Sequence, residues 1–197
     1  MMSEATERTE LHADERFSLG VLLGIGVVMS VTLVLLGRVW WCPVGDWTPW
    51  SFDVWSNHNS QHLIDPYSLS HIQHGIGLYL ILTLLAGRWL SVSGRTLVVA
   101  LVEAVWEVAE NTHWIINRYR EATVSLDYFG DSILNSISDY LMCLIGVLLA
   151  RKTSWPWAVG IFVALEITSV LWIRDSLLLN ILMLVCPIDA IKQWQAS

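Results

Sequence analysis

Two apolar stretches decide the fold: TLVVALVEAVWEVAENTHWII at residues 96–116 and DSILNSISDYLMCLIGVLLA at residues 131–150. Each is long enough to cross a bilayer as a helix, which takes about 20 residues at a rise of about 1.5 Å per residue. Both stretches carry ionisable side chains at membrane depth, where each such group costs roughly 2.5–3.5 kcal/mol on insertion scales. Acids in such positions are rare and usually functional, so they are the starting point for predicting what the protein does.

The composition is that of a membrane protein. Of the 197 residues, 54% are hydrophobic and 15% are charged, whereas a soluble domain carries about 25% charged residues. The 12 tryptophans are typical of a chain that meets membrane–water interfaces. A formal net charge of −7 excludes a broad basic surface for nucleic acid. The three cysteines, Cys42, Cys143 and Cys186, match no CxxC or zinc-ribbon spacing, so we expect isolated thiols.

The hydropathy pattern divides the chain into a polar N-terminal tail at residues 1–16 and one transmembrane domain at residues 17–197. It predicts an all-α, polytopic helical bundle with about six membrane helices. Five are full spans, at residues 17–37, 68–87, 96–116, 131–150 and 155–173. The sixth is the short apolar segment at residues 177–188, which we expect to be a short span or else a re-entrant helix. A Trp-rich loop at residues 38–67 joins the first two spans.

The distribution of basic residues predicts the orientation. With six spans and a cytoplasmic N-terminus, seven Lys and Arg residues lie inside and four lie outside, as the positive-inside rule favours. The Trp-rich loop is then periplasmic, and the ionisable groups of three spans converge just below the outer surface.

Polar residues follow one face of each helix in this region. The third span has acids at spacing i, i+4, i+7: Glu103, Glu107 and Glu110. The fourth span has polar residues at spacing i, i+4, i+8: Asp131, Asn135 and Asp139. His71 and His74 share a face of the second span, because residues three apart on a helix are neighbours. We therefore expect these stripes to face one another.

This constellation predicts a divalent metal site for Zn, Mn or Mg, because carboxylates suit hard cations and His adds affinity for Zn and Mn. The candidate ligands are His71, His74, Glu107, Glu110, Asp127 and Asp131. The candidate catalytic acids are Glu103, Glu107 and Asp139. Other members of the predicted polar cluster are Asn111, His113, Arg118, Arg120 and Asn135. A metal would offset the cost of the buried acids and activate water, although the spacing matches no motif such as HExxH.

Three other interpretations stay open. A chain of acids and histidines inside a bundle is also typical of a proton- or ion-coupled transporter. A metal-free acid–base or lipid-group-transfer site could use His74 or a glutamate as base. A structural polar core could fix helix register, with Arg118 or Arg120 pairing the acids, in a non-catalytic subunit of a membrane complex. Glu166, in the middle of the fifth span, is expected to be a structural or lumen-facing group.

Four stretches carry a resemblance: SHIQHGIGLY, EAVWEVAENTHWIINRYRE, DYFGDSILNSISDYLMCLIG and RDSLLLNILMLVCPIDAIKQWQ. Together they resemble a UPF-type family catalogued as domain of unknown function 2585. The resemblance implies a multi-pass protein of the bacterial inner (cell) membrane and supplies no activity. The order H…E…E…GDxxxN…D is more distantly similar to VanZ-like membrane proteins, and bears on the fold alone.

From this we expect an integral inner-membrane protein whose Glu/Asp/His cluster faces the periplasmic side. Its function is expected to be that of a metal-dependent hydrolase or transferase on a lipid or envelope substrate. Its partners are the lipid bilayer and that substrate, and nucleic acid is excluded.

Overall fold

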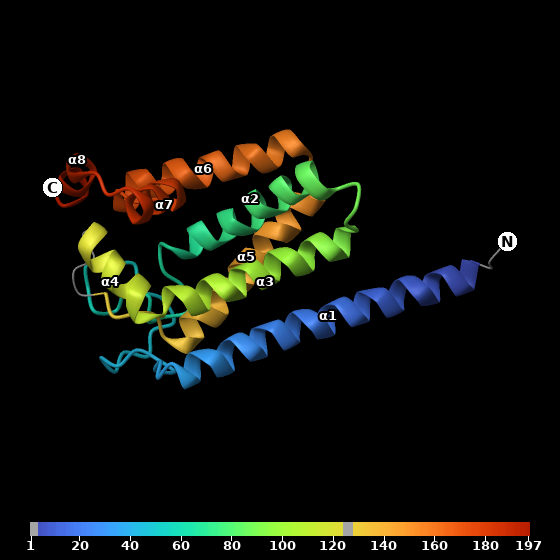
Figure 1. The fold of residues 1–197 in the computed structure, drawn as a ribbon, viewed down its shortest axis with the longest axis horizontal. Helices are drawn as coiled ribbons and strands as arrows, with labels where there is room; N and C mark the ends of the chain where they lie inside the picture. The colour runs from blue at the N-terminus through green and yellow to red at the C-terminus, as the bar shows by residue number, and fades with distance from the viewer. Residues whose placement is uncertain (1–3, 124–127) are drawn as a thin grey trace.

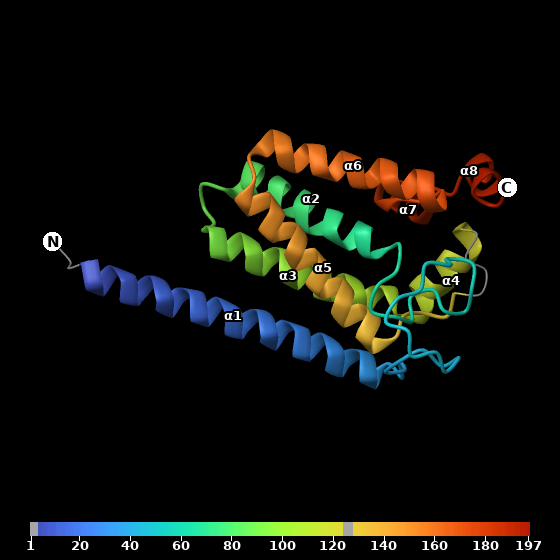
Figure 2. The same ribbon diagram turned by 180° about the vertical axis from the view of Figure 1, so that it is seen from behind.

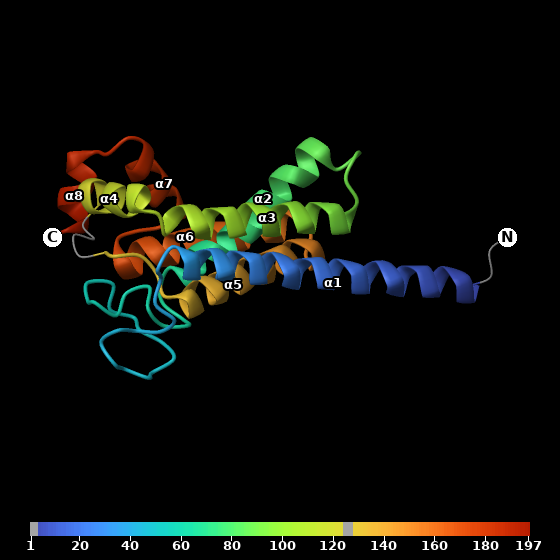
Figure 3. The same cartoon turned by 60° about the horizontal axis from the view of Figure 1, so that its bottom comes forward.

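The structure, a computed structural model, describes residues 4–123 and 128–197, with side chains from residue 19 onward. Within these residues the chain forms eight helices (Figure 1). Their bounds are α1 Glu4–Leu35, α2 Ser68–Ala86, α3 Val92–Glu110, α4 His113–Ala122, α5 Ile133–Lys152, α6 Trp155–Ile173, α7 Leu177–Val185 and α8 Asp189–Gln195. The five long helices run along a bundle, while α4, α7, α8 and the Trp-rich loop gather at the end away from the N-terminus (Figures 1, 2 and 3). The predicted all-helical membrane bundle is confirmed.

The bundle has the inverted polarity of a membrane protein. Among the described residues, α2, α5 and α6 are long and apolar enough to cross a membrane, and Leu19–Leu35 of α1 is a shorter apolar stretch. Large apolar side chains on the outer faces are exposed, for example Leu23 and Val27 on α1 and Val163 and Leu171 on α6. Polar side chains are buried between the helices instead. An apolar exterior around a polar interior is the arrangement that lipid favours.

Exposed tryptophans mark both ends of the bundle. At the end where α2 and α5 finish they are Trp89, Trp155 and Trp157. At the opposite end they are Trp40, Trp47, Trp50, Trp55, Trp114, Trp172 and Trp194. Helix α6, with 19 residues, connects the two groups and is about 28 Å long, close to the hydrocarbon thickness of about 30 Å. Such aromatic belts are typical of the two membrane–water interfaces.

The third predicted span, residues 96–116, is wrong at its end, because α3 stops at Glu110 and α4 begins at His113. The side-chain amide of Asn111 bonds back to the carbonyl four residues earlier at 3.0 Å, and the Thr112 hydroxyl to the carbonyl three residues earlier at 2.6 Å. Asn and Thr side chains compete in this way with the hydrogen bonds of a continuing helix. Thr112 then caps α4, and the chain turns away from the helix axis.

The predicted short sixth helix, α7, does not cross the membrane. Its nine residues make about 14 Å of helix, less than half of the hydrocarbon thickness. It packs at the same end as α4, and Lys192 in the following helix bonds to the carbonyl of Glu121 in α4 at 2.6 Å. Lys192 therefore belongs with the loop-side residues, which changes the balance of basic residues between the two sides from seven and four to six and five.

Glu166 on α6 anchors α7. One carboxylate oxygen accepts from the Ser176 hydroxyl at 2.7 Å and from the Leu178 amide at 3.1 Å, while the other accepts from the Gln73 side chain at 2.7 Å. These contacts give hydrogen-bond acceptors to donor groups at the start of α7, and they link that helix to α2. They give Glu166 the structural role that was expected from the sequence.

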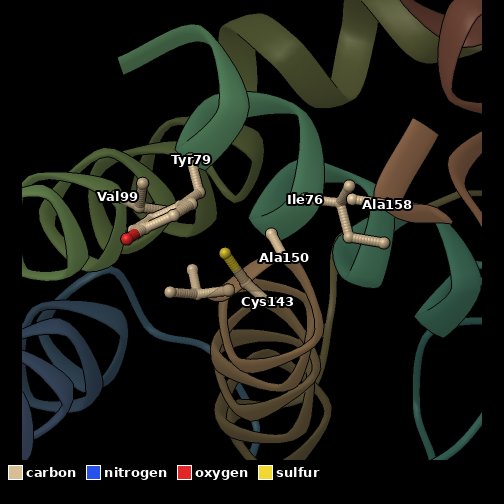
Figure 4. Packing of buried hydrophobic residues seen from close by; sticks show 7 residues of the cluster. Ile76, Tyr79, Val99, Cys143, Ala150 and Ala158 are labelled. Carbon is tan, nitrogen blue, oxygen red and sulfur yellow. The ribbon is translucent and has the colours of Figure 1, made fainter. Parts of the chain in front are cut away.

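The α2–α5 crossing is the closest packing in the bundle. A Cβ built on Gly75 would lie 2.0 Å from the Cys143 carbonyl oxygen, and one built on Gly146 would lie 2.0 Å from the Ile72 carbonyl oxygen. Only glycine allows two helix backbones to approach so closely. Next to the crossing, buried apolar residues fill the space between α2, α3, α5 and α6 (Figure 4). The labelled members are Ile76, Tyr79, Val99, Cys143, Ala150 and Ala158.

Replacing Gly75 by Ala should destabilise the bundle by about 1–3 kcal/mol or more, because two helix backbones must separate to admit the methyl group. The measurement is the thermal unfolding midpoint of detergent-purified protein. The control is Gly160→Ala on α6, where no atom lies within 4 Å of the added Cβ. Equal midpoints for the two variants would contradict the close crossing.

The loop between α6 and α7 should give stability a pH dependence. Burial raises the pKa of Asp175 from 3.8 to about 6. The folded protein then holds this proton more tightly than the unfolded chain, so the stabilisation is complete below pH 3.8 and is lost as the pH rises through about 6. A shift of about two pKa units corresponds to about 3 kcal/mol.

The Asp175→Asn variant removes this titration. Between about pH 4 and 7, the unfolding midpoint of the parent protein should therefore fall more steeply than that of the variant. Parallel profiles in thermal unfolding at a series of pH values would contradict the assignment.

Candidate functional site

The ionisable residues of α2, α3 and α5 converge at the loop end of the bundle. His71 and His74 come from the first turns of α2, and Asp139 comes from α5. Glu103 and Glu107 occupy the face of α3 that is turned toward them. The structure thus brings together the three helix faces that the spacing identified.

Glu103 joins the two histidines. Its two carboxylate oxygens lie 2.6 Å from His71 Nδ1 and 3.0 Å from His74 Nδ1. Because a carboxylate can only accept, each Nδ1 carries the hydrogen, and Nε2 of a neutral ring keeps its lone pair. Glu103 therefore fixes the tautomer and the orientation of both rings, as carboxylates do for metal-binding histidines. The sequence placed Glu103 among the catalytic acids; its contacts are those of a positioning residue.

Glu107 is buried without a hydrogen-bond partner. It is 1% exposed, and both of its carboxylate oxygens lack a partner among the described residues. Its nearest charged neighbour is His71, whose Nδ1 lies 3.3 Å away but already bonds to Glu103. On the other side of the ring, Asp139 Oδ2 lies 3.8 Å from His71 Nε2. An unpaired buried carboxylate is costly, and it indicates a proton or a cation at this point.

Asp131 lies on the loop side of the cluster, just before α5. Its carboxylate accepts from the Asn111 amide and from the Tyr128 hydroxyl, each at 2.8 Å, and its backbone N–H donates to Asn111 Oδ1 at 2.8 Å. Arg38 donates to its carbonyl at 3.1 Å. Asp131 thus has a full set of partners of its own, and it joins the end of α3 to the start of α5.

The cluster lines a cavity of about 60 Å³. The ionisable residues in its wall are His71, His74, Glu110, Asp131 and Asp139. Polar residues from the loop, α4 and α7 close it: Asn59, Ser60, Tyr67, Tyr119, Tyr128 and Asn180. Since a water needs about 10–15 Å³ of such volume, the cavity has room for an ion and a few waters or small groups.

Several predicted members of the site lie elsewhere. Asp127 is outside the described residues. His113 begins α4 and is exposed, because the helix break at Asn111 turns it away from the α3 face. Arg118 donates to the carbonyl of Leu184 at 2.8 Å, and Arg120 to that of Tyr128 at 2.5 Å. Within the described part of the chain, the cluster acids form ion pairs with histidines alone, so neither arginine supplies the pairing that a structural core was expected to have.

Sequence reasoning missed the contribution of the loop. Asp65 accepts from the amides of Tyr67 and Ser68 at 2.8 and 3.1 Å, and so caps the first turn of α2. Asn135, predicted as part of the cluster, instead donates to Asp65 at 3.3 Å and to the carbonyl of His62 at 2.8 Å. Burial raises the pKa of Asp65 to about 6. The signal was local, since an Asp followed by Pro and then Ser is typical of a helix start.

The donor atoms suit a divalent cation. Ligand atoms of His71, Glu107 and Glu110 lie within 4.8 Å of one another, as do those of His71, His74 and Glu103. The first group includes the carboxylate that lacks a partner and is the better candidate. A mixture of imidazole and carboxylate favours Zn or Mn over Mg. The buried His and Glu side chains can therefore hold a metal.

Comparisons with known proteins show the family to which the chain belongs. Residues 33–197 match the family model described as protein of unknown function (DUF2585). The chain is 50% identical to a UPF0314 protein of Sinorhizobium fredii over 176 residues, which cover 89% of this chain and 88% of that protein. It is 46% identical to a UPF0314 protein of Rhizobium meliloti over 186 residues, covering 92% and 93%. No solved structure matches, and the comparisons do not show the more distant VanZ-like similarity.

Replacing Asn111 by Leu should destabilise the fold by about 1–3 kcal/mol for each buried group left unpaired, since Asp131 loses both a donor and an acceptor. Thermal unfolding measures the effect. The matched control is Asn117→Leu on the exposed side of α4, which should change the midpoint little. A midpoint for Asn111→Leu as high as that of the control would show that Asp131 does not depend on this pair.

Proposed function

The chain belongs to the DUF2585 family, and we propose that this helical membrane bundle is a metal-dependent hydrolase or transferase acting on a lipid or envelope substrate. One observation carries the proposal. The Glu107 carboxylate is buried without a hydrogen-bond partner, and its oxygen lies within 4.8 Å of ligand atoms of His71 and Glu110, beside a cavity lined by polar and apolar residues.

Charge balance supports a bound cation. Five acids, Glu103, Glu107, Glu110, Asp131 and Asp139, lie in or beside the cavity, and among described residues their ion pairs are with His71 and His74. Uncompensated charges in an apolar bundle cost several kcal/mol each. Bound Zn or Mn offsets this cost, polarises a substrate oxygen and lowers the pKa of bound water.

The side chains have distinct roles in this proposal. His71, Glu107 and Glu110 hold the metal, and Glu103 keeps the His71 and His74 rings in the orientation that they need. Asp139, 3.8 Å from His71 Nε2, is placed to accept a proton at the cavity wall. Asp131 has its own hydrogen-bond partners and shapes the wall on the loop side.

The surroundings of the cavity favour a substrate embedded in the membrane. The cavity lies at the end of the bundle where tryptophans of the loop and of α4, α6 and α8 form an exposed belt. Its wall also contains apolar residues, Trp106, Leu177 and Ile181. The small volume means that only the reacting group of a larger molecule enters, while the rest remains in the interface.

The packing next to the site argues against a transporter. Beyond the cluster, the Gly75–Gly146 crossing and the apolar layer around Ile76 and Val147 fill the bundle toward its other end. A continuous path for ions needs polar groups or water through that region. The site is therefore reached from one end. We place that end in the periplasm and the N-terminus in the cytoplasm, in the bacterial inner membrane.

The test is metal content and activity in a variant that keeps the shape of the site. Protein purified in detergent without chelators should contain metal, and Glu107→Gln should lose about one ion per chain while remaining folded. Elemental mass spectrometry measures the metal, and thermal unfolding checks the fold. In lipid nanodiscs, metal-dependent cleavage or transfer on lipid phosphoester and acyl substrates should disappear in the same variant.

Glu121→Gln, on the exposed face of α4, is the control and should keep both metal and activity. An unchanged metal content in Glu107→Gln, or no metal in the parent after loading with Zn and Mn, would contradict the proposal. Proton-coupled flux in proteoliposomes would instead support the alternative function, a proton- or ion-coupled transporter.

A further inference from the structure

Three metal-ligating side chains meet in the Trp-rich loop, outside the cluster described above. Cys42, His58 and His62 offer ligand atoms that all lie within 4.8 Å of one another. Cys42 Sγ is 3.4 Å from His58 Nδ1, which is 3.1 Å from His62 Nε2. The sequence predicted isolated thiols; Cys42 is a free thiol, and it lies beside two histidines. Separations of 16 and 4 residues match no metal-binding motif, and only the fold of the loop brings the three together.

The hydrogen bond on the far side of His62 fixes the tautomer of its neutral ring. Its Nδ1 faces the carbonyl oxygen of Thr48, which can only accept, so Nδ1 carries the hydrogen. Nε2 of the neutral ring therefore presents a lone pair toward His58. A histidine that binds a metal through one nitrogen typically donates the other N–H to a backbone carbonyl or a carboxylate in this manner.

With neutral rings, hydrogen bonds satisfy the three converging atoms only in part. If His58 Nδ1 carries a hydrogen, it can donate to His62 but cannot accept from the Cys42 thiol. If it carries a lone pair, it can accept from Cys42 but then faces the lone pair of His62. One atom is left without a partner in either tautomer, whereas a cation at the centre accepts electron pairs from all three.

The distances suit a tetrahedral ion. With Zn–S of about 2.3 Å and Zn–N of about 2.0–2.1 Å, a tetrahedral centre separates sulfur from nitrogen by about 3.6 Å and two nitrogens by about 3.3 Å. The structure has 3.4 Å between sulfur and nitrogen and 3.1 Å between the nitrogens. Cys42 and His62 are 5% and 0% exposed, so two of the three ligands are buried in place.

We propose that Cys42, His58 and His62 form a zinc site that fixes the Trp-rich loop. Zinc binds the Cys42 thiolate and the two imidazoles, and the thiol proton leaves to solvent as the metal binds. Water takes the fourth position. Asp46 adds a negative charge near both histidines, and hydrogen bonds from Thr48 lower the pKa of Asp46 and keep it ionised.

This site holds the wall of the central cavity in place. Immediately beside His62, the Gln61 side chain donates to the Gly130 carbonyl at 2.8 Å, and the Ser60 carbonyl accepts from the Ser132 amide at 3.0 Å. Ser60 and its neighbour Asn59 line the cavity. A metal that closes the loop at residues 42–62 thereby orders the segment that covers the cluster. The zinc site does not depend on the proposed catalytic function.

Cobalt distinguishes the two sites, because among the candidate metal groups of the described residues only this one includes a cysteine. Full-length protein in detergent is stripped with a chelator, kept reduced without added thiols, and titrated with Co²⁺. One equivalent should produce a thiolate-to-cobalt charge-transfer band with the visible absorption of a tetrahedral centre, and Zn²⁺ should displace it. Cys42→Ser should abolish the band and His62→Gln should abolish or weaken it, whereas Glu107→Gln should leave it intact.

Cys186→Ser is the matched control, since Cys186 is an exposed thiol. If Cys42→Ser does not fold, retention of the band in both Cys186→Ser and Cys143→Ala assigns the thiolate to Cys42 by elimination. The proposal is overturned if the parent protein gives no thiolate band, if the band survives in folded Cys42→Ser, or if either of the other cysteine variants abolishes it. Loss of metal in Glu107→Gln with an intact cobalt band would show that the central site and the loop site bind metal independently.

Discussion

Carboxylates buried between apolar helices need compensation, and the structure around the cluster provides it unevenly. Glu103 is bonded to two imidazoles, and Asp131 to Asn111 and Tyr128. Glu107 has no such bond. Because an unpaired buried carboxylate is costly, this one residue indicates the point where a proton or a cation is held.

The bundle is closely packed on one side of that point. The glycine contact between α2 and α5 brings two helix backbones together next to the cluster, and apolar side chains fill the layer beyond it. At the end of the bundle that holds the cluster lie the Trp-rich loop, the α3–α4 break, and the short helices α7 and α8 (Figure 1). Irregular backbone at membrane depth is tolerated where it lines a polar cavity, and here it does.

The helices and the convergence of the polar faces could be predicted because both follow from local periodicity. Residues three and four apart share a helix face, so the stripes of α3 and α5 were readable without a structure. The end of α3 was missed: Asn111 and Thr112 bond back to carbonyls of their own helix, and Asn111 also bonds to Asp131, 20 residues away, which no local pattern shows. The roles of Arg118 and Arg120 were missed for a similar reason, since their partners are backbone carbonyls on other segments.

The sequence by itself determined that the protein is a helical membrane bundle and which helix faces carry its acids, since hydropathy and spacing act within single segments. Only the tertiary structure decided which acids are paired, that Glu107 is left without a partner, and that Cys42 meets His58 and His62 in the loop. Those facts depend on distances between residues far apart in the chain. The loop that contains Cys42 has no period, so its fold, and the ligand set that it creates, arise only from its packing against α5 and its own tryptophans.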